Sequence, residues 1–243
     1  MVLVAAACGS GGGGETKTVT VTETVTTPTV GTTTFRVYFL HGGKLQPVAR
    51  SVPETQFVVT ATLAALVGGP SQSERELGLT SAIPSDWKHA LQQHVSEATV
   101  DGTSDLSAAA KAQLVYTLTQ FSSIRRVGLD GESRIRADFE NETPIILVES
   151  PLPFEKVRSP LRATGTANTF EATFNYDLVG PDGKVIAHHF VTATSGSGTR
   201  GTFDFTVPFT VPQSGQGKLV VYELSAKDGS RIHQSEIPLT LEP

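Results

Sequence analysis

The run Val115-Tyr116-Thr117-Leu118-Thr119-Gln120-Phe121 ends an alanine-rich segment that begins at Leu106, and it organises the first half of this chain. Alanine favours helix because it loses no side-chain entropy on ordering. Ser107 or Asp105 can supply the oxygen that caps the first turn. The apolar residues of the segment recur at helical spacing and predict one buried stripe: Leu114, Val115, Leu118 and Phe121.

A strand pattern, Ile124 to Leu129, follows this helix directly and is ended by the turn Asp130-Gly131. A helix that leads straight into a strand must pack its apolar stripe across the sheet which that strand joins. Together with the other patterned segments, the order β-β-α-β-α-β-β predicts an α+β fold with one small sheet and two helices on one face. These segments are strands at 35–40 and 45–52, a helix at 57–67, one or two strands within 87–100, and a last strand at 134–139.

The second half of the chain has no helical pattern, and its composition indicates an all-β fold. Turn clusters such as Gly180-Pro181-Asp182-Gly183 separate strand-like runs at a spacing typical of a β-sandwich. The alternation is regular in Phe203, Phe205 and Val207. Seven strands are predicted, at 145–149, 161–165, 169–178, 185–194, 201–211, 218–225 and 232–241.

Composition excludes several classes of protein. The chain has 243 residues, of which 38% are hydrophobic and 18% charged, with a formal net charge of −5. This charge gives no basic patch for nucleic acid. Its single cysteine, Cys8, excludes a disulfide framework and a cysteine-based zinc site.

The amino terminus resembles the end of a bacterial lipoprotein signal peptide. Residues 1–8 are small and apolar and end at the lone Cys8, which is followed by a glycine run. In that family the cysteine is lipidated and becomes the first residue of the mature chain. The resemblance therefore implies a lipid anchor on Cys8, and the true translation start is expected to lie upstream.

Residues 9–33 form a Gly- and Thr-rich segment in which Pro28 and Gly31 interrupt a Thr-Val alternation. We interpret it as a disordered stalk. A tether of about 25 residues reaches up to roughly 80 Å when extended, enough to hold a folded head away from a membrane.

Residues 34–140 resemble the GerMN domain, which is named for a spore-germination lipoprotein. The matching pieces occur in the family's order: Phe35–Phe39, Ala65–Pro70, Gly78–Pro84, Ala98–Asp101 and Val115–Phe121. The resemblance implies a fold similar to the ring-building modules of sporulation complexes, and so a role in protein–protein assembly. It transfers no catalytic residue.

Residues 143–243 resemble the immunoglobulin-like domain that accompanies GerMN in bacterial spore-germination proteins. The matching pieces are Ile146–Pro151, Val157–Leu161, Thr164–Ala167, Thr169–Glu171 and Val220–Glu223. With no cysteine pair, hydrophobic packing alone is expected to hold its two sheets together.

Catalytic, metal and cofactor sites are not expected. His188 and His189 are adjacent, so in a strand they point to opposite faces, and His89 and His94 lack a third partner. No Gly-x-Ser-x-Gly surrounds Ser195 or Ser197, and the glycine run lacks the Lys-Ser/Thr ending of a phosphate loop. Two groups of carboxylates could serve in acid-base chemistry, but their spacing alone does not distinguish them from solvated charges: Asp101 with Asp105, and Asp138 with Glu140 and Glu142. The pair Arg125-Arg126 could contact anionic wall polymers.

The sequence therefore predicts a non-enzymatic, extracytoplasmic lipoprotein of the cell envelope, associated with spore germination or sporulation, that binds protein partners. The alternatives are a peptidoglycan- or glycan-binding module, and an accessory to a membrane sensor kinase like the LpqB-type lipoproteins, which GerMN also resembles. A wall hydrolase is a third class, and it would require two carboxylates gathered in one pocket.

Overall fold

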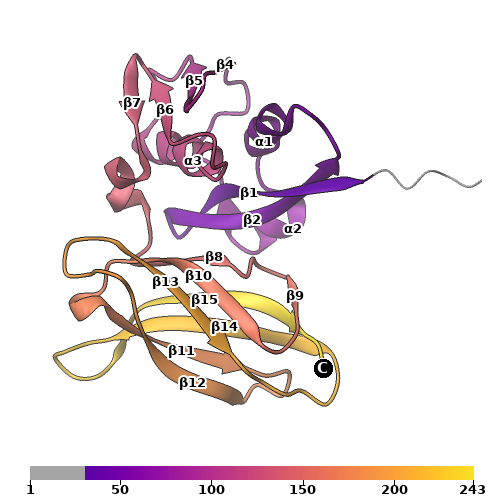
Figure 1. The fold of residues 1–243 in the computed structure, drawn as a ribbon, viewed down its shortest axis with the longest axis vertical. Coiled ribbons are helices and arrows are strands. Elements are labelled where there is room, and N and C mark those ends of the chain that lie inside the picture. Colours follow the sequence, from indigo (N-terminus) through magenta and orange to yellow (C-terminus); the bar gives the residue numbers. More distant parts are fainter. Residues whose placement is uncertain (1–30) are drawn as a thin grey trace, which may run out of the picture. The chain divides into compact units, whose positions relative to one another are not determined.

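The structure of the protein is a computed structural model that describes residues 31–243 (Figure 1). An α+β part precedes an all-β part, as the sequence predicts. Each part has a hydrophobic core of its own. No helix within residues 31–243 is long and apolar enough to cross a membrane.

The α+β part contains two sheets. One is three-stranded with the order β2-β1-β3, and the other is four-stranded with the order β4-β5-β6-β7, in which only β5 and β6 run parallel. Its elements are β1 Thr32–His41, β2 Lys44–Pro53, α1 Val58–Val67, α2 Gln72–Glu76, β3 Leu79–Thr80, β4 Ala90–Gln93, β5 Glu97–Asp101, α3 Ala108–Leu118, β6 Arg126–Leu129, β7 Glu132–Arg134 and the 3-10 helix η1 Arg136–Glu142.

Several details of this part differ from the sequence-based prediction. The single small sheet is two sheets, because α3 lies between them and contacts both β1 and β6 (Figure 1). A short third helix, α2, follows Pro70, where Ser71 and Glu74 form a capping box. The strand expected at 134–139 ends at Arg134, and η1 replaces the rest of it. In addition, β1 begins at Thr32, inside the segment interpreted as the stalk.

Helix α3 is buried on nearly all sides, which explains its alanine-rich sequence. Ser107 caps it by accepting a hydrogen bond from the Ala110 amide at 3.2 Å. Of the predicted stripe, Leu114, Val115 and Leu118 are fully buried and Phe121 is partly buried.

Polar side chains of α3 and its C-terminal end bind the backbone of β1 along the edge that β3 leaves uncovered. The Tyr38 amide donates to Thr117 Oγ1 at 3.1 Å, and the Tyr38 carbonyl accepts from Gln113 Nε2 at 2.9 Å. Gln120 accepts from the Arg36 amide at 2.8 Å and donates to the Arg36 carbonyl at 2.6 Å. The helix therefore supplies the hydrogen-bond partners that a neighbouring strand would otherwise give to the backbone of β1.

The C-terminal part is a β-sandwich. One sheet has the order β13-β10-β8 and the other the order β12-β11-β14-β15-β9. Each of the seven predicted strand regions contains a strand; β9 was not predicted, and the 3-10 helix η2 replaces the start of the third region. The elements are β8 Ile146–Ser150, β9 Lys156–Val157, β10 Leu161–Ala167, η2 Phe170–Ala172, β11 Thr173–Val179, β12 Val185–Thr192, β13 Gly201–Val207, β14 Gly215–Leu224 and β15 Arg231–Leu241.

Aromatic packing holds the two sheets of the sandwich together. Phe174 of β11 is fully buried and meets the ring of Phe203 on β13 edge-on, with 4.9 Å between ring centroids. Beside them Gly165 cannot carry a side chain, because its Cβ would lie 2.0 Å from the Leu147 carbonyl oxygen.

We expect Gln113→Leu to destabilise the protein by about 2–4 kcal/mol. Gln113 is fully buried, and the change leaves the Tyr38 carbonyl and the Ala82 amide, 2.8 Å from Gln113 Oε1, without partners. Urea unfolding followed by circular dichroism measures the effect. The same substitution at the exposed Gln234 is the control and should shift stability by less than about 0.5 kcal/mol. Equal effects at the two positions would contradict the role of Gln113.

Candidate functional site

The one site residue predicted from the sequence, Cys8, lies outside the described residues, as does the stalk up to residue 30. The lipid anchor therefore stays a prediction. The remaining candidates lie on described residues and can be located.

The histidines are not brought together into a metal site. Within residues 31–243 there is no group of three or more His, Cys, Asp or Glu side chains that could hold a metal ion. His188 lies opposite Asp177 and its Nδ1 is 2.6 Å from Asp177 Oδ1, whereas His189 lies opposite Tyr176 in the register. His89 stacks on Trp87, with 4.5 Å between ring centroids.

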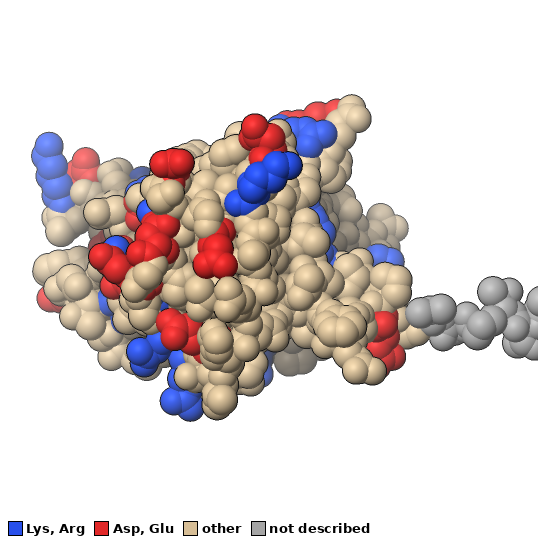
Figure 2. All heavy atoms as spheres, turned by 90° about the horizontal axis from the view of Figure 1, so that it is seen from above, with Lys and Arg blue, Asp and Glu red and all other residues tan. Residues whose placement is uncertain are grey.

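The candidate carboxylates have separate partners. Asp138 accepts from the Ile135 amide at 2.8 Å, Asp101 accepts from Gln92 at 3.2 Å, and Glu140 pairs with Arg200. Arg125 and Arg126 are exposed. On the face shown in Figure 2, acidic and basic side chains are interspersed over a largely uncharged surface. This face offers no broad patch of one sign for a charged polymer.

Ser197 stabilises a turn, and no neighbouring side chain activates its hydroxyl group as a nucleophile. Its Oγ accepts from the Glu171 amide at 3.0 Å, and its own backbone is left-handed with φ of 52°. None of its hydrogen bonds is to a histidine, so it lacks the adjacent base that a nucleophilic serine needs.

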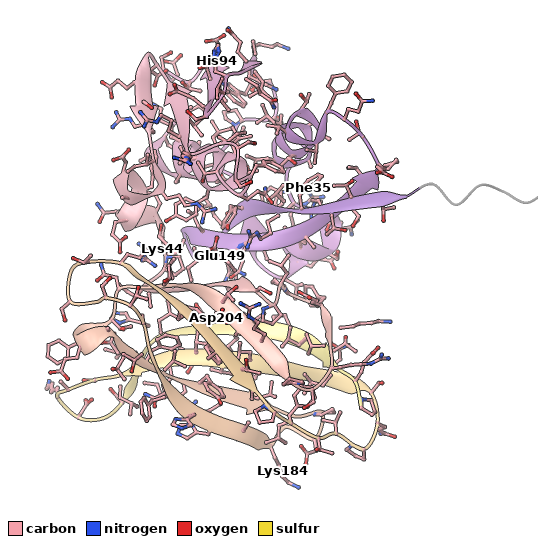
Figure 3. All side chains as sticks on the ribbon, viewed as in Figure 1. Phe35, Lys44, His94, Glu149, Lys184 and Asp204 are labelled. Atoms are coloured by element: carbon pink, nitrogen blue, oxygen red, sulfur yellow. The ribbon has the colours of Figure 1, made fainter. Side chains whose placement is uncertain are left out.

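Glu149 lies at the junction of the two parts (Figure 3). It belongs to β8 of the sandwich, and its Oε1 accepts from Arg136 Nη1 at 2.8 Å and from the Tyr38 hydroxyl. Its carbonyl accepts from Arg36 Nη1 at 3.2 Å. Three residues of the α+β part thus converge on one residue of the sandwich.

Arg136 is the cation that compensates the partly buried negative charge of Glu149. Its guanidinium lies 4.7 Å from the ring centroid of Tyr116 and 5.6 Å from that of Tyr38. Its Nε donates to Thr119 Oγ1 at 2.8 Å, and Nη2 donates to the Tyr116 carbonyl at 3.2 Å. Every nitrogen of the partly buried guanidinium therefore has a partner.

The charges at the junction shift the pKa values of its members. Burial alone would raise the pKa of Glu149, but the charge of Arg136 and the hydrogen bond from Tyr38 outweigh burial and hold this pKa below its ordinary value. Burial, and then the carboxylate of Glu149, raise the pKa of Tyr38 far above the ordinary tyrosine value. Tyr38 therefore stays a neutral donor and Glu149 a charged acceptor, so this group serves as a structural clamp.

A second ion pair crosses the same junction. Arg200, in the segment before β13, pairs with Glu140 of η1 through Nε at 2.8 Å and Nη2 at 2.9 Å. Arg200 Nη2 also donates to the Pro144 carbonyl at 2.8 Å. The bidentate geometry fixes η1 against the sandwich.

Strand β8 is shared between the two cores. Ile146 and Val148 belong to the core of the sandwich, whereas Leu147 belongs to the core of the α+β part. Because successive side chains of a strand point to opposite faces, one strand serves both cores.

A groove of about 180 Å³ lies at this junction and is largely apolar. Two large apolar side chains in it are half exposed, Leu77 at 50% and Phe154 at 49%. The lining residues come from both parts: His41, Gln46, Val48, Glu74, Leu77 and Leu79, with Pro153, Phe154, Glu236 and Pro238.

Rigid elements position both exposed side chains of the groove. Leu77 ends α2, whose Glu74 is tied to Arg50 of β2 at 2.7 and 2.5 Å. Phe154 has φ of 67°, which is unusual for a bulky residue, and its amide donates to the Pro238 carbonyl at 2.7 Å. The groove can therefore receive an apolar side chain without first having to become ordered.

Sequence reasoning missed both the clamp and the groove. One signal was available for the clamp, because the carboxylate Glu149 directly follows the apolar run Ile145–Val148. The groove had none, because Leu77 and Phe154 are far apart in the chain and only the fold brings them together.

We expect Glu149→Gln to destabilise the protein by about 1–3 kcal/mol near neutral pH, because it leaves the partly buried charge of Arg136 without its carboxylate partner. The pKa of Glu149 is depressed in the fold, so its stabilisation is full above its unfolded value, near 4.5, and is lost as pH falls through the folded value. Thermal unfolding at neutral and acidic pH measures both effects. The variant should lose less stability on acidification than the parent. Glu132→Gln, at a 65% exposed carboxylate, is the control and should behave as the parent.

Comparison with known families finds two matches on adjoining segments. A family described as "Sporulation and spore germination" (Germane) matches residues 36–133. A family described as "Immunoglobulin-like domain of bacterial spore germination" (Gmad2) matches residues 145–230. Both resemblances expected from the sequence are therefore confirmed.

Two solved structures show distant likeness. Tandem GerMN domains of the sporulation protein GerM from Bacillus subtilis are 16% identical, with a TM-score of 0.31, over 73% of this chain and 61% of that one. WR4, an MSP family member from C. elegans, is 13% identical, with a TM-score of 0.24, over 40% of this chain and 96% of that one. TM-scores this low carry no structural argument.

No curated protein sequence matches the chain significantly. The family matches therefore carry the assignment, and each lies on one of the two parts that the fold contains. The chain therefore carries a segment that matches the sporulation and spore germination family, followed by a segment that matches the immunoglobulin-like domain of bacterial spore germination.

Proposed function

We propose that this protein is a non-enzymatic, protein-binding module of the cell envelope that acts in sporulation or spore germination. The observation that carries the proposal is the apolar groove, which both parts line and the Glu149 clamp keeps in place. Binding there needs shape and apolar contact only, consistent with the families, which are associated with sporulation and germination rather than with a reaction.

The groove favours a partner segment that inserts one large apolar side chain next to a basic residue. Its floor is apolar, and the charged side chains that line it are the carboxylates Glu74 and Glu236. Each already pairs with a cation, Arg50 and Lys218 respectively, so the electrostatic preference is modest. Burial of Leu77 and Phe154 then supplies most of the affinity.

We also propose that the protein is extracytoplasmic and anchored through a lipid on Cys8, with residues 9–33 as the stalk. Support comes from the sequence, in which the sole cysteine follows a run of small apolar residues and precedes a glycine run. A head that engages envelope partners needs to be held at the membrane surface and at some distance from it, which a lipid and a stalk together achieve.

One observation favours a second function, binding of wall glycan. A hollow of about 510 Å³ on the outer side of β10 and β13 is lined by hydroxyl groups and two carboxylates, which could hydrogen-bond a polyhydroxylated ligand. The polar residues are Thr164, Thr166, Thr192, Thr194, Thr202, Glu149 and Asp204. The hollow has no exposed aromatic platform among its lining residues, so we rank this function second.

Photo-crosslinking tests the groove. A photoreactive residue placed at Leu77 should form a discrete adduct with an envelope protein in host cells, and Phe154→Asp should abolish that adduct because the charge opposes apolar insertion. Aspartate tolerates the left-handed backbone at this position, so the fold should persist. The same probe at Val95, which is 99% exposed and does not line the groove, is the control.

Adducts that form equally at Leu77 and Val95, or that survive Phe154→Asp, would contradict the groove as a binding site. Retention on purified wall sacculi, equal for the parent and for Phe154→Asp, would instead favour the glycan-binding function.

Mass spectrometry of the protein from host membranes tests the anchor. We expect a diacylglyceryl group on Cys8 and the loss of residues 1–7. An unmodified Cys8 in a soluble fraction would disprove lipidation, and Cys8→Ser should move a lipidated protein out of the membrane fraction.

A further inference from the structure

We propose that the free edge of β12 is a self-association surface, on which the β12 strand of a second copy pairs antiparallel. The two five-stranded sheets would then form one continuous sheet across the dimer. The inference rests on a comparison of all sheet edges within residues 31–243, and it does not depend on the proposed function.

Strand β12 is the last strand of its sheet. It pairs with β11 on one side, from Thr192 opposite Thr173 to Val185 opposite Val179, and the structure places no strand on its other side within residues 31–243. An unpaired strand edge presents backbone donors and acceptors that another strand can bind.

The other edge strands of the described part are short or carry charged or proline residues. β3 and β9 have two residues each, β7 has three and β4 has four. The longer ones carry charge or proline: Lys44, Pro47, Arg50 and Pro53 in β2, Asp204 in β13, and Glu149 in β8. These are the features by which proteins prevent edge-to-edge pairing.

Strand β12 is longer and carries neither charge nor proline, and its one irregularity is near its start, where Ile186 has no partner in the register with β11. Its eight residues, Val-Ile-Ala-His-His-Phe-Val-Thr, include no Lys, Arg, Asp, Glu or Pro. Two of its large apolar side chains are exposed, Val185 at 53% and Phe190 at 59%. An exposed, uncharged and partly apolar edge of this length is a pairing site by the same criteria.

We infer a second copy as the occupant because this uncharged edge lets two chains of like net charge pair. The chain carries a formal net charge of −5, so two copies repel each other over most of their surface. An edge without fixed charge is a place where they can meet without like charges facing each other. Asp177, the nearest carboxylate in the register, is already paired with His188 and with Arg231 at 2.7 Å.

The backbone hydrogen bonds indicate the register. The Phe190 amide donates to His189 Nδ1 at 2.7 Å instead of to β11, so it belongs to the free edge, and the amide of His188, two residues away, shares this edge. A two-fold axis through His189 places Phe190 of each copy opposite His188 of the other, on one face. His189 then faces itself as a non-hydrogen-bonded pair, with Cα atoms about 4.5 Å apart.

The dimer should be weak. Eight residues span about 26 Å of strand, and one such pairing buries less than the roughly 1,600 Å² of a standard stable interface. The His189 ring must also release the Phe190 amide before a partner strand can take it. We expect a dissociation constant in the micromolar range or weaker.

Sedimentation velocity over a wide concentration range tests the proposal, with the full chain carrying Cys8→Ser to remove the native thiol. We expect a concentration-dependent dimer that Phe190→Lys converts to a monomer, because a lysine on the edge opposes pairing. Leu224→Lys, at a 49% exposed position on the interior strand β14, is the matched control and should still dimerise. Circular dichroism confirms that each variant is folded.

Disulfide trapping tests the register in the same background. His189→Cys should give a covalent dimer under mild oxidation, whereas Thr192→Cys, which faces residue 186 of the other copy, should not. A chain that stays monomeric at every concentration, a dimer that survives Phe190→Lys, or a dimer that His189→Cys fails to trap would overturn the proposal.

Discussion

The hydrogen bonds between α3 and the backbone of β1 are the interaction on which the rest of the α+β part depends. Gln113, Thr117 and Gln120 provide the donors and acceptors that a neighbouring strand would otherwise supply. A helix in that place ends one sheet and allows a second sheet to form on its far side. Burying these side-chain amides costs little free energy because each one is hydrogen-bonded, whereas a single buried donor or acceptor without a partner would destabilise the fold.

This arrangement explains which parts of the fold the sequence predicted. The apolar spacing of Leu114, Val115 and Leu118 predicted the helix and its buried stripe, and of the two predicted caps, Ser107 and Asp105, the structure has Ser107. The same pattern could not show that the polar residues of the helix are buried too. Periodicity separates apolar from polar residues, and it does not reveal that Gln113 and Thr117 bind the backbone of a strand. The prediction of a single sheet was wrong because the sequence pattern does not show that this helix takes the place of a strand beside β1.

The β-sandwich was easier to predict because alternation and turn residues are local signals. The candidate site was harder because its members come from distant segments: Leu77 and Phe154 face one groove, and Glu149 meets Tyr38 and Arg136, only in the folded chain. No local sequence pattern predicts such contacts between residues that are distant in the chain. The resemblance to two spore-germination families identified the parts, and the geometry of their junction had to come from the structure.

The sharing of β8 between two cores has a consequence for folding cooperativity. Leu147 contributes to one core while Ile146 and Val148 contribute to the other, so neither core is complete unless β8 is in place. Local opening of the sandwich at β8 removes a side chain from the α+β core and exposes the buried pair of Glu149 and Arg136 to water. We therefore expect the two parts to unfold as one cooperative unit, because a cut between them removes an apolar residue from one core or the other.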